Sequence, residues 1–347
     1  MGLTETQIDQ AVARYERERD RYQKLTDFVH EACVQLVGDN AIPATVQSRT
    51  KSPDRLKGKL LKKQAEYESV EDVFGPAGFK DFAGVRVATY VERDRARVVA
   101  EIQQRFAGPD SGNVAVDVRN YSHNFYRGTH CLVMLTNADL VAGYENVRDT
   151  RCEVQVCSLL AHVWNEIQHD RDYKPMSGEL NEQERSALDS LGNLTRAGDT
   201  IIETLLGATD ARLADIQGTF QDQWDFVARA RRLFPEASDF GTHSGQLYQE
   251  LMDLDMDTPE RLQELIADNG NDRASRLLLQ LQQYLDDTAD AVVRQLDPNS
   301  SDLLLVLLLE TKAQSILDRH PGGRGQGRPP RIASVARRFL DMPEPKP

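Results

Sequence analysis

The stretch RCEVQVCSLLAHVWNEIQHDRDYK, residues 151–174, decides the fold because it starts as a strand and continues as a helix. In its first half, polar Glu153, Gln155 and Cys157 alternate with apolar residues, which is the period of a strand with two unlike faces. Ser158 is placed to cap a helix whose apolar residues recur at helical spacing. Two hydrogen-bond acceptors therefore share one face of a strand just before a helix N-terminus, which favours a site for a metal ion and a phosphate.

A metal site needs a second carboxylate, and Asp81 is the best placed. It lies in KDFAGVRVATYV, residues 80–91, directly before a predicted strand over Phe82–Val91. The segment VQSRTKSPDRLKGKLLKK, residues 46–63, is basic although the whole chain is acidic. Its lysines and arginines are typical either of a solvated helix face or of a polyphosphate clamp, and the segment alone does not separate the two.

Composition limits the classes of function. The 347 residues carry a net charge of −13, which argues against a general nucleic-acid coat and against an anionic membrane partner. No apolar run approaches the roughly 20 residues of a membrane span, and the first residues do not form a secretory signal. The four cysteines form no CxxC pair, which is typical of reduced thiols. We therefore expect a cytoplasmic protein that does not bind membranes.

Hydrophobic periodicity predicts an α+β protein with a long helical extension. A helix from Thr4 to about Leu36 comes first, strands with interspersed helices follow, and the pattern is entirely helical after Lys174. We expect a mixed sheet of about five strands flanked by helices, followed by an all-α region. The predicted domains are residues 1–215, a helical domain over 216–320, and a linker, short basic helix and Pro-rich tail over 321–347.

Five short motifs follow one another along residues 49–174. They are RxKS with trailing lysines (Arg49, Lys51, Ser52, Lys57, Lys59), DxxGVR (Asp81, Gly84, Arg86), a polar loop (Asn124, Tyr126, Arg127, His130), ExQ (Glu153, Gln155) and W…H…YK (Trp164, His169, Tyr173, Lys174). In this order they resemble the nucleotide pyrophosphokinase domain of the RelA/SpoT family, the alarmone synthetases, whose fold is nucleotidyltransferase-like. The resemblance covers roughly residues 20–210.

The resemblance implies that the 3′-hydroxyl of an acceptor nucleotide attacks the β-phosphorus of ATP, so that pyrophosphate moves and AMP leaves. It implies a Mg²⁺ ion bound by Asp81 and Glu153, with Glu153 also accepting the hydroxyl proton and Gln155 orienting the acceptor ribose. Tyr126 would stack on the acceptor base. The ATP side would comprise Arg49, Lys51, Ser52, Lys57, Lys59 and Arg86, whose guanidinium stacks on adenine or meets a phosphate, and the acceptor side Asn124, Tyr126, Arg127, His130 and His169.

The chain departs from the family pattern mainly on the acceptor side. Cys157 stands where the family has Arg, and Phe125 where it has Gly; Gly128, Ser122 and Gln168 replace Ser, Lys and Glu. Because the donor motif is intact, we expect ATP as donor, and the changed acceptor residues predict that the acceptor, GDP/GTP or another one, need not be a guanine nucleotide.

Two other functions stay open. One is toxin-like pyrophosphorylation of the 3′ end of tRNA, with an antitoxin or regulatory protein as partner; the other is a catalytically weak nucleotide-sensing or partner-binding module. A homo-oligomer is also expected. His162, Glu166 and His169 follow helical spacing, but the chain lacks HExxH there, so we do not expect zinc.

Overall fold

The computed structural model of the chain describes residues 2–75, 78–109, 112–120, 125–140, 143–173, 180–213, 216–266, 270–287, 295–320 and 330–343. The chain divides into two compact units. Unit 1 comprises Met1–Val37 and Pro43–Glu203, and unit 2 comprises Gly38–Ile42 and Thr204–Pro347. The sequence analysis expected the first domain to end at residue 215, and that boundary stays a prediction.

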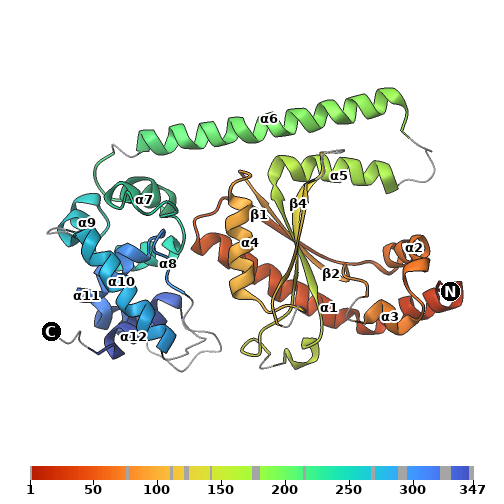
Figure 1. Cartoon of the computed structure of the whole chain (residues 1–347), viewed down its shortest axis with the longest axis horizontal. Helices are drawn as coiled ribbons and strands as arrows, with labels where there is room; N and C mark the ends of the chain where they lie inside the picture. The colour runs from red at the N-terminus through yellow and green to blue at the C-terminus, as the bar shows by residue number, and fades with distance from the viewer. Residues whose placement is uncertain are drawn as a thin grey trace. The chain divides into compact units, whose positions relative to one another are not determined.

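Unit 1 contains the mixed sheet of five strands that the sequence predicts (Figure 1). The strand order is β1-β2-β5-β4-β3; β2 and β5 are parallel, and the other neighbours are antiparallel. The strands are β1 (Ala44–Thr50), β2 (Ala83–Thr89), β3 (Ala115–Asn120), β4 (Arg127–Val133) and β5 (Cys152–Ser158).

Strand β1 is the strand that the sequence analysis did not predict. Its residues ATVQSRT are polar at most positions, and the strand is largely exposed at the edge of the sheet. An edge strand with few buried side chains lacks the apolar alternation on which strand prediction rests. Its place matters because Arg49, on this strand, is paired with Gly84 of β2.

Helices flank the sheet of unit 1 (Figure 1). The predicted long N-terminal helix is confirmed as α1, whose Tyr15 hydroxyl donates to the carbonyl of Lys51 at 2.6 Å. Ser158 accepts a hydrogen bond from the amide of Ala161 at 3.1 Å, as expected for the cap of α5. The helices are α1 (Glu5–Asp39), α2 (Pro53–Lys62), α3 (Val70–Phe74), α4 (Asp94–Arg105), α5 (Leu159–Tyr173) and α6 (Glu182–Leu213), of which residues after Glu203 belong to unit 2, with short 3₁₀ turns at Gln64–Glu66 and Glu145–Val147.

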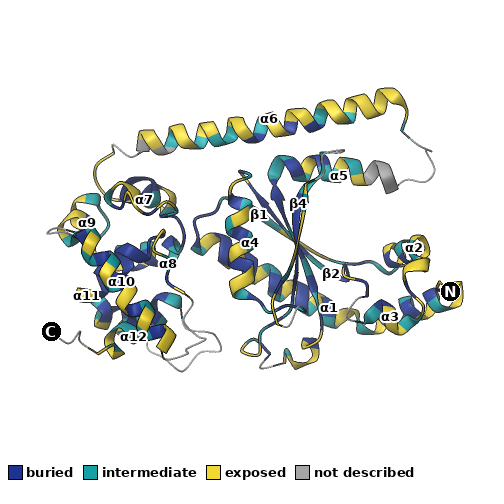
Figure 2. Cartoon of the chain, viewed as in Figure 1, coloured by how far each residue is buried: buried dark blue, intermediate teal, exposed yellow. Residues whose placement is uncertain are grey.

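The strand register gives the sheet one apolar face and one polar face. Val85, Val87, Val154 and Val156 are almost fully buried, and the central strands are mostly buried (Figure 2). The intervening positions carry the polar residues: Gly84 pairs with Glu153, Arg86 with Gln155, His130 with Gln155 and Arg119 with Gly128. Side chains from all five strands therefore meet on one face.

Unit 2 is all-helical, as predicted. Its core gathers the aliphatic and aromatic residues of these helices, and Leu303–Leu309 is a buried segment of α11. No helix in the described ranges has the length and apolar character needed to cross a membrane. The elements are α7 (Gln223–Ala230), a 3₁₀ turn (Arg231–Leu233), α8 (Ser244–Asp253), α9 (Pro259–Ile266), α10 (Gly270–Asp287), α11 (Asp302–Arg319) and α12 (Arg331–Asp341).

Candidate active site

Asp81 lies at the centre of a cluster of cations. Its Oδ2 accepts from Lys51 Nζ at 2.5 Å and from Lys59 Nζ at 2.9 Å, and Arg49 comes within 4.0 Å of Oδ1. Burial alone would raise the pKa of Asp81, but Lys59 and Lys51 lower it to about 2. Burial also lowers the pKa of Lys51, although Asp81 opposes this shift. The carboxylate is therefore ionised at neutral pH and held by basic residues of the 46–63 segment.

Glu153 belongs to a separate hydrogen-bonded chain on β4 and β5. His130 Nδ1 lies 3.1 Å from Glu153 Oε1, Gln155 donates to Oε2 at 3.0 Å, and the Tyr126 hydroxyl lies 2.6 Å from His130 Nε2. Because an ionised carboxylate only accepts, His130 donates from Nδ1, and in the neutral ring Nε2 accepts from Tyr126. Burial raises the pKa of Glu153, but the hydrogen bond from His130 holds it below its usual value.

Arg86 is fixed by partners on both β5 and α5. Its guanidinium donates to Gln155 Oε1 at 3.3 Å and to His162 Nδ1 at 3.1 Å, and it pairs with Glu166 at 2.8 Å. Burial and the neighbouring Arg86 both lower the pKa of His162, which favours the neutral ring as acceptor. With these N–H groups engaged, the guanidinium keeps its planar face for a ligand.

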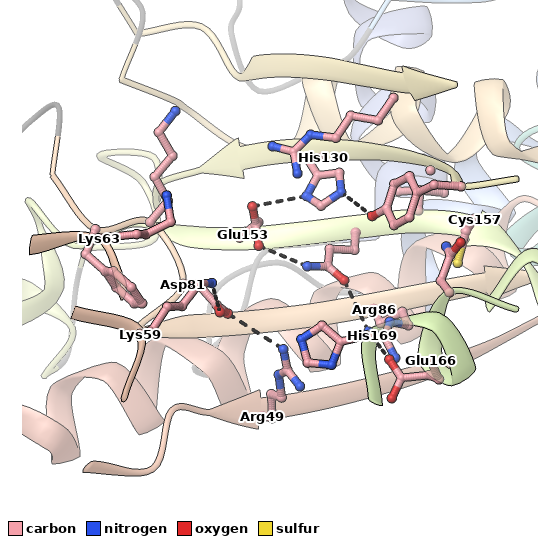
Figure 3. Close-up of a pocket in the computed structure, with 18 of the residues that line it drawn as sticks. Arg49, Lys59, Lys63, Asp81, Arg86, His130, Glu153, Cys157, Glu166 and His169 are labelled. Atoms are coloured by element: carbon pink, nitrogen blue, oxygen red, sulfur yellow. Dashed lines mark hydrogen bonds and ion pairs between the residues drawn. The ribbon is translucent and has the colours of Figure 1, made fainter. Parts of the chain in front are cut away.

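These three groups open onto one cavity of about 650 Å³ (Figure 3). Asp81 and Glu153 both line it, and the charge of Asp81 raises the pKa of Glu153. Among the described residues that line it, six are basic and four are acidic, although the whole chain carries −13. The basic residues are Arg49, Lys59, Lys63, Lys80, Arg86 and Arg119, and the acidic ones are Glu66, Asp81, Glu153 and Glu166. The cavity is suited to an anionic ligand.

Residues 48–177 match the family model described as a region found in RelA / SpoT proteins. The chain contains a RelA/SpoT region. This match indicates a pyrophosphokinase enzyme. A search of curated proteins gives no match.

Solved structures similar to this chain include small alarmone synthetase 1 from Bacillus subtilis, with 19% identity and a TM-score of 0.44 over 57% of this chain and 99% of that one. A GTP pyrophosphokinase family protein from Streptococcus pneumoniae has 18% identity and a TM-score of 0.43 over 55% and 92%. The B. subtilis synthetase 1 bound to its product pppGpp has 19% identity and a TM-score of 0.43 over 56% and 97%.

The RelA/SpoT region brings most of the predicted site residues to the cavity. Arg49, Lys59, Asp81, Arg86, Tyr126, His130, Glu153, Gln155 and His169 line it.

The remaining predicted residues lie elsewhere. Lys51 reaches the site only through Asp81, and Ser52 precedes α2 without capping it through its side chain. Lys57 pairs with exposed Asp9 at 2.6 Å, and Arg127 pairs with buried Asp199 at 2.7 Å. Neither Lys57 nor Arg127 is among the described residues lining the cavity. Asn124 lies outside the described residues.

Several residues of the cavity were not predicted as ligands of a nucleotide. Arg119 lies on β3, Lys63 follows α2, and Glu166 comes from α5. The alternation of Asp117 and Arg119 with Val116 and Val118 was a signal that could have placed Arg119 on the polar face. Within the described part of the chain, no group of three His, Cys, Asp or Glu residues is arranged to hold a metal.

Phe125, which stands where the family has Gly, packs between helices. Its ring lies 6.0 Å from the ring of Trp164 in an edge-on arrangement, and Arg196 of α6 stacks over it at 4.6 Å. A Cβ on Gly192 of α6 would approach within 2.1 Å of Phe125 Cγ. The absence of a side chain at Gly192 thus leaves room for the ring of Phe125. Through this ring, the residue before Tyr126 packs against α5 and α6.

Proposed function

We propose that the chain transfers pyrophosphate from ATP to the 3′-hydroxyl of a guanine nucleotide. The observation that carries this proposal is the placement of two ionised carboxylates, Asp81 and Glu153, in one cavity beside a cluster of cations. The RelA/SpoT match supports the class of reaction. The cations match a polyphosphate donor, since phosphoryl transfer depends mainly on positioning and on charge stabilisation.

The reaction assigns a task to each group. The 3′-oxygen of the acceptor forms a bond to the β-phosphorus of ATP, the bond from that phosphorus to the α–β bridging oxygen breaks, and AMP leaves with the electron pair. Glu153 accepts the hydroxyl proton. Gln155 donates a hydrogen bond to Glu153 and accepts one from Arg86. It therefore holds the residue proposed for the acceptor at a fixed place relative to the residue proposed for ATP. The flat face of Arg86 is free to stack on a base, and Arg49 and Lys59 contact phosphates.

The two carboxylates also fit a Mg²⁺ ion. They are hard oxygen donors, and their mutual repulsion across the cavity would be relieved by a divalent cation. Because no group of three His, Cys, Asp or Glu residues among the described residues could hold a metal, the remaining ligands would be phosphate oxygens and water. When bound, Mg²⁺ neutralises charge on the phosphates. Asp81 would then have to share its oxygens with Lys51 and Lys59.

The test is a transfer assay with γ-labelled ATP and separate pools of GDP, GTP, ADP and deacylated tRNA. Label in the guanine nucleotide is the expected result, because the γ-phosphorus travels with the transferred pyrophosphate. Label in tRNA would favour the toxin-like function instead, and label in neither would favour a nucleotide-sensing module. Label in ADP alone would retain the donor chemistry and overturn the guanine acceptor.

A further inference from the structure

Arg119 is a basic residue of the cavity to which the mechanism above gives no task. It lies near the end of β3, where its cross-strand partner is Gly128 of β4. Gly128 has no side chain, and a Cβ there would lie 3.5 Å from the hydroxyl of Tyr126, so the position opposite Arg119 borders Tyr126. Its side chain is 36% exposed and lines the same cavity as Tyr126 and Glu153.

The charge of Arg119 acts on the acceptor end of the cavity. Burial raises the pKa of Tyr126 to about 12, and Arg119 is the largest influence that opposes this rise. Burial lowers the pKa of Arg119, but Asp117 raises it most, and Glu153 and Tyr126 add to this rise. Among the described residues of β3 and β4, Arg119 is the one lysine or arginine that lines the cavity. It therefore supplies the positive charge beside the Tyr126–His130–Glu153 chain.

The present partner of Arg119 is replaceable. Asp117 accepts from Arg119 Nε at 2.7 Å, but its side chain is 61% exposed. An ion pair at such an exposed position adds little stability, since water screens it. The bond also uses only Nε, so the two terminal nitrogens of the guanidinium can meet the oxygens of a phosphate in a bidentate contact.

Four of the other five described cations of the cavity pair with carboxylates that line it, and the fifth, Lys80, adjoins Asp81 in the chain. Lys59 and Arg49 surround Asp81, and Arg86 is held by Glu166 and its neighbours. Lys63 pairs with Glu66 at 2.8 Å. If ATP phosphates occupy the Asp81 side, the 5′-phosphates of a second nucleotide near Tyr126 need their own cation, and Arg119 is placed to supply it.

We propose that Arg119 binds the 5′-phosphates of the acceptor nucleotide and so selects a phosphorylated acceptor over a bare nucleoside. This inference rests on the proposed function for its naming of an acceptor, but it concerns binding and can be measured without turnover.

The experiment is calorimetric titration of the full chain with GDP and with guanosine, each in the presence of AMPCPP. The variant R119M removes the charge and keeps a side chain of similar length. We expect it to weaken the affinity for GDP about ten- to hundredfold, which is the range for a lost charge-assisted hydrogen bond. Its affinity for guanosine and for AMPCPP should not change. R119K should recover part of the loss, since it restores the charge without the fork.

Two variants serve as controls. R148M removes an exposed arginine that bonds Asn137 and does not line the cavity, so it should leave all affinities unchanged. D117N removes the competing carboxylate and should leave GDP affinity equal or higher. Unfolding midpoints of all variants verify that each one is folded.

The outcomes separate this inference from the proposed function. An unchanged GDP affinity in R119M, an equal loss for guanosine, or wild-type chain that binds no GDP would overturn the role of Arg119. If R119M loses GDP affinity while the wild-type chain transfers no label to any acceptor, the phosphate contact stands and the proposed catalysis fails.

Discussion

Glu153 differs from the other carboxylates of the cavity because its hydrogen-bond partners are a histidine and a glutamine, whereas lysine or arginine binds each of the others. His130 and Gln155 fix its two oxygens, and Glu66 across the cavity bonds only the exposed Lys63. We expect E153Q to lower the turnover of pyrophosphate transfer about 10²- to 10⁴-fold, the range for a lost general base. The unfolding midpoint should change little. The γ-label assay measures the first quantity, with E66Q as the matched control; wild-type turnover in E153Q would remove Glu153 from the mechanism.

Asp81 combines a role in the site with a role in stability. Lys51 is buried beside it, so D81N would leave a buried ammonium group without its charge partner. Breaking a buried pair from one side costs about 3–5 kcal/mol, and we expect a loss of that order in urea unfolding together with the loss of transfer. D9N is the control, because Asp9 and Lys57 form an exposed Asp–Lys pair whose loss should not be measurable. Full stability in D81N would contradict the buried pair.

Asp302 is the corresponding buried carboxylate of unit 2. Arg331 binds it through two nitrogens at 2.7 and 2.6 Å, and His243 lies 3.0 Å from Oδ2. Burial alone would raise the pKa of Asp302, but Arg331 and His243 lower it far below its usual value. A lowered folded-state pKa means that the stabilisation is complete above the unfolded-state pKa of about 3.9 and is lost as pH falls below it.

The pH dependence follows from that sign. D302N should destabilise unit 2 by about 3–5 kcal/mol at pH 7, and the difference from wild type should shrink at pH 3, where the wild-type carboxylate begins to protonate on unfolding. Urea unfolding at the two pH values measures both quantities. A difference that stays constant between them would show that the lowered pKa does not contribute to stability.

At the scale of elements, α5 and α6 support Phe125, the residue before Tyr126. Phe125 connects them to the start of β4, and its ring fills the space above Gly192. A methyl group at Gly192 would push the ring away, and overpacking of this kind costs about 1–3 kcal/mol. We expect G192A to be less stable and to have a raised KM for the acceptor, because Tyr126 follows Phe125 directly.

The comparison variant is G207A on the same helix. A Cβ there meets nothing within 4 Å, so the substitution should leave KM unchanged and stabilise the helix by about 0.5–1 kcal/mol. Thermal unfolding and acceptor titrations of both variants check the prediction. Equal behaviour of G192A and G207A would mean that the contact with Phe125 does not matter for the site.

At the scale of the whole molecule, the two units have separate cores. Unit 1 is organised around the sheet, and unit 2 around a cluster of helices that includes α10 and α11. We expect urea unfolding to show two transitions, since separate cores break two-state behaviour. GDP with AMPCPP should shift only the transition of unit 1, by mass action, whereas D302N should shift only the other. A single transition moved by both would contradict this independence.

Most of the architecture could be predicted from local patterns. Alternation in 152–157 gave a strand, helical spacing gave α1 and α5, and the helical region after residue 180 followed from its periodicity. Strand β1 could not be found in this way, because its identity as a strand comes from pairing with β2 and not from its own apolar residues. For the same reason, the sequence did not decide whether the basic segment 46–63 is a solvated helix face or a polyphosphate clamp.

The sequence by itself determined which chemical groups the chain has and which neighbours share a face, because side-chain direction along a strand or helix is periodic. It singled out Asp81, Glu153 and the 46–63 cations as one site, and their convergence on one cavity depends on strand order, which residues distant in the chain settle together. Only the tertiary structure added Arg119 to the cavity and directed Arg127 to a buried carboxylate. Local periodicity can place Arg119 on the polar face of its strand, but the cross-strand register and the packing between helices that decide these two outcomes leave no trace in it.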